Sequence, residues 1–400
     1  MRPRHRITSA RRIWTWSIFS GILVQSACAL AAPYTPASDA QVLAEVLPGS
    51  AHTSVMTRDL ARTRADVALP LAQFYIARSR ATGDLRYLGY AEGELLPWVG
   101  SPSPVQPTAL VLQATILQSR HAFDPALVEL DRALAIAPNN AQGWLTRATI
   151  LRVLGRYPEA LLSCGRLAPE AESSVVQLCE QSLRALTGHL QEAYAEVESI
   201  PPAALPPPIQ AWRDSELAEM AERLGEDTAA ERWFREGLRV APEDVYLRAA
   251  YADLMLLHGR AAETLQLLSG YGSFEPLLLR IVIAQRLLGD TGTATAAGRA
   301  TATAQARLES AFALEEQRGE SVHRREQARF LLDVEHRPEA SLAAALENWR
   351  VQREPDDVLI LLRAAREAGR PDAAKGARDF LAQNQLQDSR LEPYIEGARR

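Results

Sequence analysis

The sequence predicts an all-α solenoid of stacked helical hairpins, and three observations carry this prediction. Ala, Leu, Arg and Glu dominate the composition while aromatic residues make up only 6%, which favours helices over strands. No stretch alternates Val, Ile or Thr with polar residues as a half-buried strand does. Glycines at predicted helix ends recur at a near-constant spacing: Gly155 and Gly188 are 33 residues apart, and Gly225 and Gly259 are 34 apart. Such a period is typical of repeat proteins.

The N-terminus has the layout of a secretory signal peptide. Residues 1–31 contain five arginines and no acidic residue, and an apolar run from Ile13 to Val24 precedes Ala29-Leu30-Ala31. A basic start, a short apolar run and small residues at the cleavage position define such a signal. We therefore expect a signal peptide at 1–31 and export of the chain to the periplasm. An uncleaved signal anchor is the alternative, and it would attach the protein to a membrane.

The rest of the chain divides into four expected parts. Residues 32–68 are expected to form helices that cap the stack. Hairpins then follow in two blocks, 69–200 and 211–400, with a proline-rich spacer at 201–210 between them. About eight hairpins account for this length. The spacer is either a stiff surface loop or a hinge between the blocks.

The stretch Asn140–Leu167 shows how one hairpin is encoded. Each of its two predicted helices has one apolar face with helical spacing. The residues of these faces are Trp144, Ala148, Leu151, Ala160, Cys164 and Leu167. Gly155 ends the first helix and Pro158 opens the second. Because Ala148 and Ala160 are small, the two helix backbones can approach closely.

Turns between the predicted helices carry two recurring features. A proline combined with an Asn, Asp or Glu cap is expected to start helices at Ala137–Asn140, Ala241–Asp244 and Glu354–Asp357. Four histidines also fall at predicted turns and are expected to be exposed, too far apart to share a metal ion. These histidines are His121, His189, His258 and His336.

The Asn140–Leu167 hairpin resembles the tetratricopeptide repeat, a pattern of about 34 residues. The matching residues are Trp144, Ala148, Gly155, Ala160 and Leu167. The resemblance implies a right-handed superhelix whose first helices line a concave groove, where a protein or peptide partner binds. The whole chain is also similar to exported bacterial tetratricopeptide proteins, a likeness that implies no mechanism.

Candidate groove residues follow from the groove positions of that family. They are Thr149, Arg152, Arg286, Arg325, Arg329, Arg363 and Arg366, while Glu219 and Glu222 occupy the same positions of another repeat. The arginines of the second half suit an acidic segment of a partner, because guanidinium groups bind carboxylates well. The alternative is that carboxylates on neighbouring helices neutralise these arginines.

Cys164 and Cys179 lie on predicted neighbouring helices of successive hairpins. In an exported protein they could form a disulfide that closes a loop of about 15 residues and contributes roughly 3 kcal/mol. The alternative is two buried thiols, since free cysteine is a common core residue. Spacing alone does not decide between them.

The net charge and the absence of known motifs limit the classes of function that the sequence supports. The net charge is −5, and without the five N-terminal arginines it becomes −10, which argues against bulk nucleic-acid binding. The single lysine, Lys375, follows no glycine-rich loop, and no catalytic, metal or cofactor motif occurs. We expect a non-catalytic scaffold without cofactor or metal. The alternatives are a spacer subunit of an envelope polysaccharide or secretion assembly, and a helical hydrolase of envelope sugars, whose acid pair needs no sequence motif.

Overall fold

The computed structural model describes residues 62–100, 105–167, 171–272, 274–289, 295–318 and 323–395. All of them belong to one compact unit, Thr53–Arg400. The predicted signal peptide and residues 32–61 of the predicted capping region lie outside the described residues, and their assignments stay predictions.

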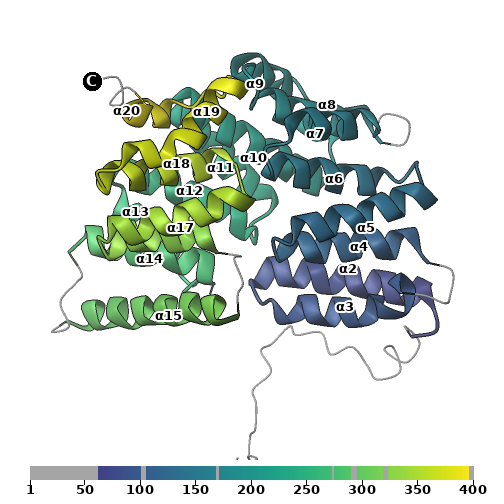
Figure 1. The fold of residues 1–400 in the computed structure, drawn as a ribbon, viewed down its shortest axis with the longest axis horizontal. Coiled ribbons are helices and arrows are strands. Elements are labelled where there is room, and N and C mark those ends of the chain that lie inside the picture. The colour runs from purple at the N-terminus through teal and green to yellow at the C-terminus, as the bar shows by residue number, and fades with distance from the viewer. Residues whose placement is uncertain are drawn as a thin grey trace, which may run out of the picture. The chain divides into compact units, whose positions relative to one another are not determined.

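The prediction of an all-α repeat fold is confirmed, because the described residues form helices and no strand (Figure 1). Consecutive helices of this part of the chain pair into nine hairpins, one more than the expected number. The first five are α2 (Ala65–Thr82) with α3 (Arg86–Val99), α4 (Pro107–Ser119) with α5 (Phe123–Ile136), α6 (Ala141–Val153) with α7 (Tyr157–Gly165), α8 (Ser173–Arg184) with α9 (Leu190–Glu198), and α10 (Pro207–Leu224) with α11 (Asp227–Val240).

The other four hairpins are less regular. They are α12 (Val245–Leu257) with α13 (Ala261–Leu267), α14 (Glu275–Leu287) with α15 (Ala296–Arg318), α16 (Arg324–Arg329) with α17 (Pro338–Val351), and α18 (Pro355–Glu367) with α19 (Lys375–Asn384). A π-helical turn, η2 (Phe330–Val334), continues α16. Short 3-10 turns, η1 (Pro202–Ala204), η3 (Pro371–Ala374) and η4 (Ser389–Leu391), and the short helix α20 (Glu392–Ile395) complete the described elements. In the predicted spacer, Pro207 is already the first residue of α10.

Helix starts follow the expected chemistry. The side chain of Asn140 accepts a hydrogen bond from Gly143 N at 2.8 Å, and that of Asp244 accepts one from Leu247 N at 2.9 Å. Glu354 and Asp357 form a reciprocal capping box at the start of α18. The three predicted caps are therefore confirmed, and each satisfies backbone N–H groups that the first helical turn leaves without partners.

One hydrophobic core joins helices that are far apart in the sequence. It includes Leu151 of α6 together with Leu361 of α18 and Phe380 of α19. The backbone N–H of Arg353 donates to the carbonyl of Val153 at 2.8 Å. The last hairpins therefore pack against the early ones, in addition to their neighbours in the stack (Figure 1).

The contact continues along the turns that follow α6, α8 and α10. Three glycines of these turns lie directly against residues 380–391, which we call the C-terminal strap. The pairs are Gly155 with Phe380, Gly188 with Gln385 and Gly225 with Ser389. A Cβ atom on Gly155 would lie 2.8 Å from Cε2 of Phe380, and the backbone φ there is 71°. Glycine is thus required at this turn both for its left-handed conformation and for the approach of the strap.

The same packing changes the environment of His121. Its ring stacks on Phe123 with centroids 5.4 Å apart, and its Nδ1 lies 3.1 Å from Nε2 of Gln352. Burial, followed by the positive charges of His323 and Arg325, lowers the pKa of His121 to about 4. The prediction of an exposed turn residue was wrong here, because the last hairpins cover this turn. The other three turn histidines are exposed.

Candidate functional site

The unit contains a cavity of about 1690 Å³ that is open to solvent. Its walls come mainly from the first helices of five successive hairpins, α10, α12, α14, α16 and α18, with a contribution from the end of α2. On α12 the lining residues include Tyr246, Ala249, Asp253 and Leu257. Their spacing of three, four and four residues places them on one face of the helix. The cavity is therefore built from the helix faces that form the concave surface of a hairpin stack.

Large apolar side chains are exposed on the cavity walls. Tyr246 and Leu257 of α12, Leu287 of α14 and Leu85 beside α3 line the cavity, and each is between 49% and 59% exposed. Large apolar groups in a concave site are typical of ligand-binding surfaces. The cavity thus presents an apolar surface without a partner from the rest of the described unit.

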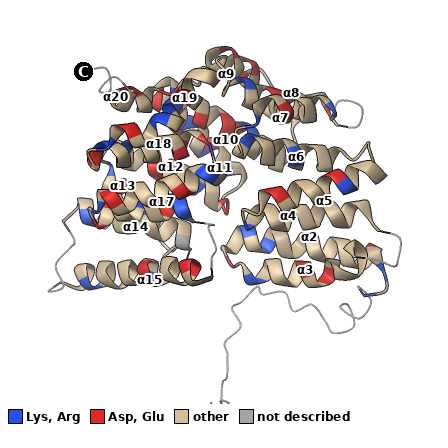
Figure 2. Ribbon diagram, viewed as in Figure 1, with Lys and Arg blue, Asp and Glu red and all other residues tan. Residues whose placement is uncertain are grey.

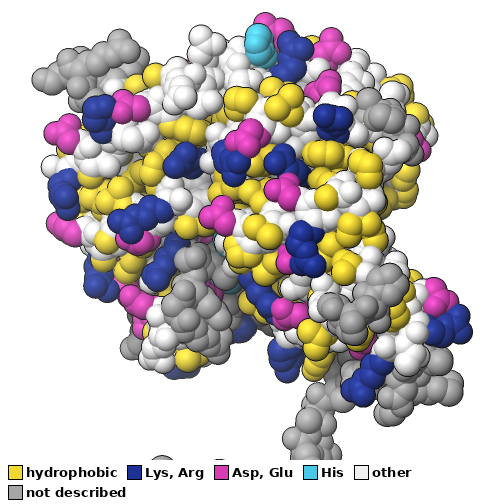
Figure 3. Space-filling model, turned by 45° about the vertical axis from the view of Figure 1, so that its right-hand side comes forward, with side chains coloured by type: hydrophobic (Ala, Val, Ile, Leu, Met, Phe, Trp, Pro, Cys, Tyr) yellow, Lys and Arg dark blue, Asp and Glu magenta, His cyan; other side chains and the backbone are white. Residues whose placement is uncertain are grey.

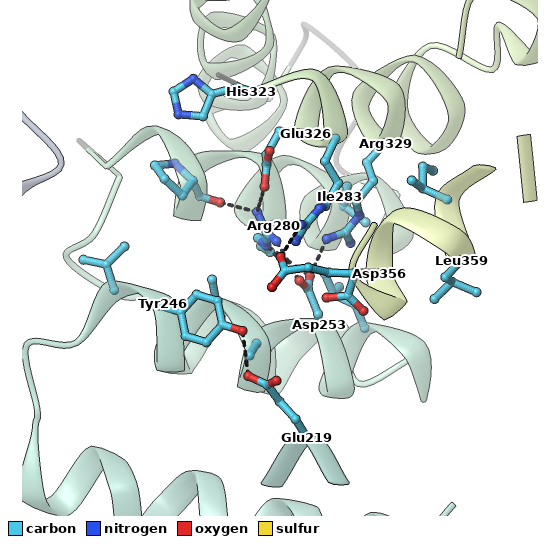
Figure 4. Close-up of a pocket in the computed structure, with 18 of the residues that line it drawn as sticks. Glu219, Tyr246, Asp253, Arg280, Ile283, His323, Glu326, Arg329, Asp356 and Leu359 are labelled. Carbon is cyan, nitrogen blue, oxygen red and sulfur yellow. Dashed lines mark hydrogen bonds and ion pairs between the residues drawn. The ribbon is translucent and has the colours of Figure 1, made fainter. Parts of the chain in front are cut away.

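Charged residues line another part of the cavity and are paired with one another (Figure 4). Asp253 of α12 accepts from Nη2 of Arg280 at 2.7 Å and from Nη1 of Arg329 at 2.8 Å. Arg363 of α18 binds Asp333 of η2 at 2.5 Å. These pairs connect α12, α14, α16, η2 and α18. Both signs of charge also lie close together along many helices of the unit (Figure 2).

Arg325 forms a second paired group at the start of α18. Its Nη2 lies 2.8 Å from Glu354 and its Nε lies 2.6 Å from Asp357. Asn348 donates to the same Asp357 oxygen at 2.7 Å. Burial raises the pKa of Asp357 to about 6, although Arg325 acts in the opposite direction. The guanidinium of Arg325 therefore supports the capping box of α18.

Carboxylates of α10 also lie on the cavity wall, and Glu219 is neutralised less completely by arginine than the carboxylates described above. Glu219 accepts a hydrogen bond from the hydroxyl of Tyr246 at 2.6 Å, but its nearest guanidinium, that of Arg152, is 3.8 Å away. Arg152 instead binds Glu216 at 2.7 Å. Burial and the neighbouring charge of Glu216 raise the pKa of Glu219 to about 7.

Glu222, one helical turn further along α10, meets the C-terminal strap. Nη1 of Arg390 lies 3.3 Å from Glu222 and 3.0 Å from Asp356, and Nη2 lies 2.7 Å from Asp388. Burial raises the pKa of Glu222 to about 8. Burial also acts to raise the pKa of Asp356, but Arg390 and its neighbouring arginines outweigh this effect and the pKa is lowered. Two carboxylates with opposite pKa shifts thus share one guanidinium nitrogen.

The structure brings most of the predicted groove residues to this cavity. The cavity-lining members are Arg152, Arg286, Arg325, Arg329 and Arg363, together with Glu219 and Glu222. Arg286 donates to the neutral side chain of Gln305 at 3.3 Å. Thr149 instead lines a smaller neighbouring pocket. Arg366 lines neither of the two: it donates to the carbonyl of Pro393 at 3.0 Å and lies over the ring of Tyr394.

Sequence reasoning missed several cavity residues. Tyr246, Asp253 and Leu257 could have been found from their helical spacing on α12, since they share a face. Arg280 follows in the same way from the corresponding face of α14. Arg390 had no usable signal, because it reaches the cavity only through the folding back of the strap.

Cys164 of α7 and Cys179 of α8 are joined by a disulfide, with their Cα atoms 5.7 Å apart. Both residues are buried in the large hydrophobic core. The bridge connects two successive hairpins and fixes the inner helix α8 against α7. Cys179 also lines the smaller pocket.

Within the described ranges, no three His, Cys, Asp or Glu side chains are grouped so that they could hold a metal ion. None of the helices in the same ranges has the length and apolar character needed to cross a bilayer.

Neither a family model nor a curated protein matches the sequence. Among solved structures, a thermophilic TPR protein of Thermus thermophilus is 22% identical and matches 48% of this chain and 100% of its own, with a TM-score of 0.38. A tetratricopeptide repeat protein of Parabacteroides merdae is 18% identical over 60% of this chain and 93% of its own, with a TM-score of 0.38. Human IFIT1, solved as a dimer with m7Gppp-AAAA, is 13% identical over 83% of this chain and 95% of its own, with a TM-score of 0.42.

These TM-scores are low, so the activities and ligands of those proteins carry no weight for this chain. The assignment of this chain to a tetratricopeptide-like fold rests on the structure of its own hairpins. In the Asn140–Leu167 unit, the small residues Ala148 and Ala160 are buried between the helices, and Gly155 adopts the left-handed turn. The described residues form an all-α solenoid of tetratricopeptide-like hairpins.

Proposed function

We propose that this protein is a scaffold that binds a segment of a protein partner in its cavity. The observation that carries the proposal is the set of exposed apolar side chains, Leu85, Tyr246, Leu257 and Leu287, on the walls of an open concave site. The cavity volume of about 1690 Å³ exceeds the range of about 300–1,000 Å³ that is usual for small-molecule sites. A polymer segment therefore suits the cavity better than a small metabolite.

Apolar contact supplies most of the binding free energy in this proposal. Arg325, Arg329 and Arg363 already bind carboxylates of neighbouring helices, so a partner carboxylate would have to displace these intramolecular partners. Giving up each of these charged hydrogen bonds costs about 1.5–3 kcal/mol, which offsets the gain from a new carboxylate, whereas covering an exposed leucine gains up to about 1.5–3 kcal/mol without such a loss. The alternative in which these arginines are neutralised by the fold is thus the better supported one.

An acidic residue of the partner would bind at Arg286. This guanidinium lines the cavity and donates to the neutral oxygen of Gln305. A partner carboxylate would replace a neutral acceptor with a charged one, which strengthens the hydrogen bond. Of the arginines predicted to bind an acidic segment, only Arg286 is therefore kept in this proposal as a contact for a partner carboxylate.

A peptide-display selection against the purified protein tests the proposal. Dissociation constants of enriched peptides would be measured by fluorescence anisotropy for the native protein, Leu257→Ser and Leu162→Ser. Leu162 is a matched control, since it is an exposed leucine, 73% exposed, that does not line the cavity. We expect Leu257→Ser to weaken binding about tenfold or more and Leu162→Ser to leave it unchanged.

Equal affinity of the two variants would place binding elsewhere on the surface. That surface also carries hydrophobic side chains between charged ones on the face shown in Figure 3. If no peptide is enriched, the scaffold proposal fails, and a spacer subunit of a larger envelope assembly becomes the better hypothesis.

We also propose that the partner is met in the periplasm, on the basis of the signal-like residues 1–31. Cell fractionation followed by N-terminal sequencing of the recovered protein tests this. A mature chain that starts near Ala32 supports export, and an intact Met1 in the cytoplasmic fraction contradicts it.

A helical hydrolase is a second candidate function, and one observation favours it. Glu222, with a raised pKa, and Asp356, with a lowered pKa, both contact Arg390 in the cavity wall. A protonated acid next to an ionised carboxylate is the arrangement that glycoside hydrolysis requires. Release of reducing sugars from envelope polysaccharide that is abolished by Glu222→Gln would establish this activity, and equal release by both proteins would exclude Glu222 as its acid.

A further inference from the structure

A second, smaller pocket of about 240 Å³ adjoins the large cavity on the inner face of the preceding hairpins. Its lining comes from the first helices α6, α8 and α10 only. The lining residues are Leu145, Ala148, Thr149, Arg152, Cys179, Ser182, Leu183 and Trp212. Arg152 lines both the pocket and the cavity. The two hollows are therefore neighbours along one inner surface.

Most polar atoms of the residues that line this pocket are bound by the protein itself. The hydroxyl of Thr149 donates to the carbonyl of Leu145 at 3.0 Å, and that of Ser182 donates to the carbonyl of Cys179 at 3.0 Å. Arg152 is held by Glu216. Nε of Arg152 is buried without a hydrogen-bond partner. Apart from this atom, the pocket offers a ligand mainly the apolar atoms of Leu145, Ala148, Leu183 and Trp212.

The walls of the pocket are held in place before any ligand arrives. One oxygen of Glu216 accepts hydrogen bonds from Arg152 at 2.7 Å and from the indole N–H of Trp212 at 3.0 Å. The indole ring is thus fixed by a hydrogen bond to Glu216, a residue that does not line the pocket. On another wall, Cys179 is anchored through its disulfide to Cys164. Binding to such a preformed site loses little free energy to side-chain ordering.

Size decides the kind of occupant. A volume of about 240 Å³ lies below the range of about 300–1,000 Å³ of sites for whole small ligands. It suits a single side chain. Tryptophan is enriched among the residues that dominate the binding energy of protein interfaces, which lie in well-packed pockets.

We propose that this pocket is an anchor site for one leucine-sized or aromatic side chain of the partner segment whose neighbouring residues lie in the cavity. The proposal rests on the proposed binding function and adds a specificity element to it. The partner segment would then combine a stretch that covers Tyr246 and Leu257 with one bulky apolar residue beyond Arg152.

Amino-acid amides test the pocket without a known partner. The probes are N-acetyl-leucinamide and N-acetyl-phenylalaninamide, with N-acetyl-glycinamide as the probe that lacks a side chain. Binding to the full protein is measured by ligand-observed NMR and by quenching or shift of tryptophan fluorescence. We expect the leucine and phenylalanine probes to bind, and the glycine probe to bind about tenfold to a hundredfold more weakly, since one buried apolar side chain accounts for that factor.

Thr149→Phe fills the pocket from an exposed position of α6 and should abolish binding of the two apolar probes. Thr303→Phe is the matched control. Thr303 is an exposed helical threonine of α15 that also donates to the carbonyl four residues earlier, and it lines neither hollow. Circular dichroism of both variants would show that the helices are retained.

Loss of probe binding in Thr149→Phe but not in Thr303→Phe supports the anchor site. Absence of probe binding to the native protein, or unchanged binding by Thr149→Phe, overturns it. The result is separate from the peptide selection, which depends on Leu257 in the cavity. Peptides that bind through Leu257 while the probes fail would refute the anchor site and leave the proposed function intact.

Discussion

Replacing Gly155 with alanine tests whether the C-terminal strap stabilises the fold. Two costs add at this position. The backbone φ of 71° is unfavourable for any residue with a Cβ, by about 1–2 kcal/mol. The new methyl group would also lie 2.8 Å from Cε2 of Phe380 and 3.2 Å from Cβ of Arg353, and such overpacking costs typically about 1–3 kcal/mol. We expect Gly155→Ala to reduce the free energy of unfolding by about 2–5 kcal/mol in total.

Gly259→Ala separates the two costs. Gly259 ends a helix with a φ of 68°, but no atom lies within 4 Å of its added Cβ. This variant should lose only the conformational term of about 1–2 kcal/mol. Urea denaturation followed by circular dichroism measures both variants. The difference between them reports the contact with Phe380, and it should shrink when Phe380→Leu is added to Gly155→Ala. Equal destabilisation of the two alanine variants would refute the role of the strap.

Three further predictions concern the disulfide, His121 and the paired charges. Replacing Cys164 and Cys179 together with alanine should lower the free energy of unfolding by about 3 kcal/mol, the value for a closed loop of about 15 residues, and an unchanged urea midpoint would contradict a stabilising bridge. His121 has a folded-state pKa of about 4 against an ordinary value of about 6.5, so the unfolded chain binds the proton more readily and the stabilisation present above pH 6.5 is lost as the pH falls towards 4. The melting temperature of His121→Asn should lack this part of the pH dependence, and identical pH profiles of the variant and the native protein would contradict the prediction. Arg329→Ala should cost about 1.5–3 kcal/mol because the partly buried Asp253 loses one of its two guanidinium partners and keeps Arg280, and a double-mutant cycle with Asp253→Asn should show that the two effects are not additive, whereas additive effects would mean that the pair does not interact.

Local features of the fold could be predicted from the sequence because they depend on neighbouring residues. The cap at Asn140 needs only a side chain that can accept from the third residue of the helix. The turn at Gly155 needs only a residue that tolerates a positive φ. The apolar faces around Ala148 and Ala160 follow from helical spacing. Each of these signals lies within one hairpin.

The folding back of the chain could not be predicted in the same way. The contact of Gly188 with Gln385 joins residues that are 197 positions apart in the sequence, and no local pattern encodes such a pair. The exposure expected for His121 failed for this reason. Gly155 and Gly225 gave no indication of their contacts with the strap. The positive φ of a turn already accounts for a glycine at these positions, so the residue type says nothing about a distant segment that lies against it.

In the candidate site, too, local sequence patterns predicted some residues but not the partners that lie on other hairpins. The groove positions carried over from the repeat pattern include Arg325, Arg329 and Arg363, which line the cavity, but the sequence left open what these arginines bind. Their carboxylate partners come from other hairpins, as with Arg329 and Asp253. A guanidinium that holds two hairpins together is costly to recruit for a ligand, whereas an exposed leucine such as Leu257 has no competing partner in the described unit. The proposed function therefore assigns stability and recognition to different residues of one cavity: the paired charges fix the positions of the inner helices, and the apolar residues between them remain available to a partner.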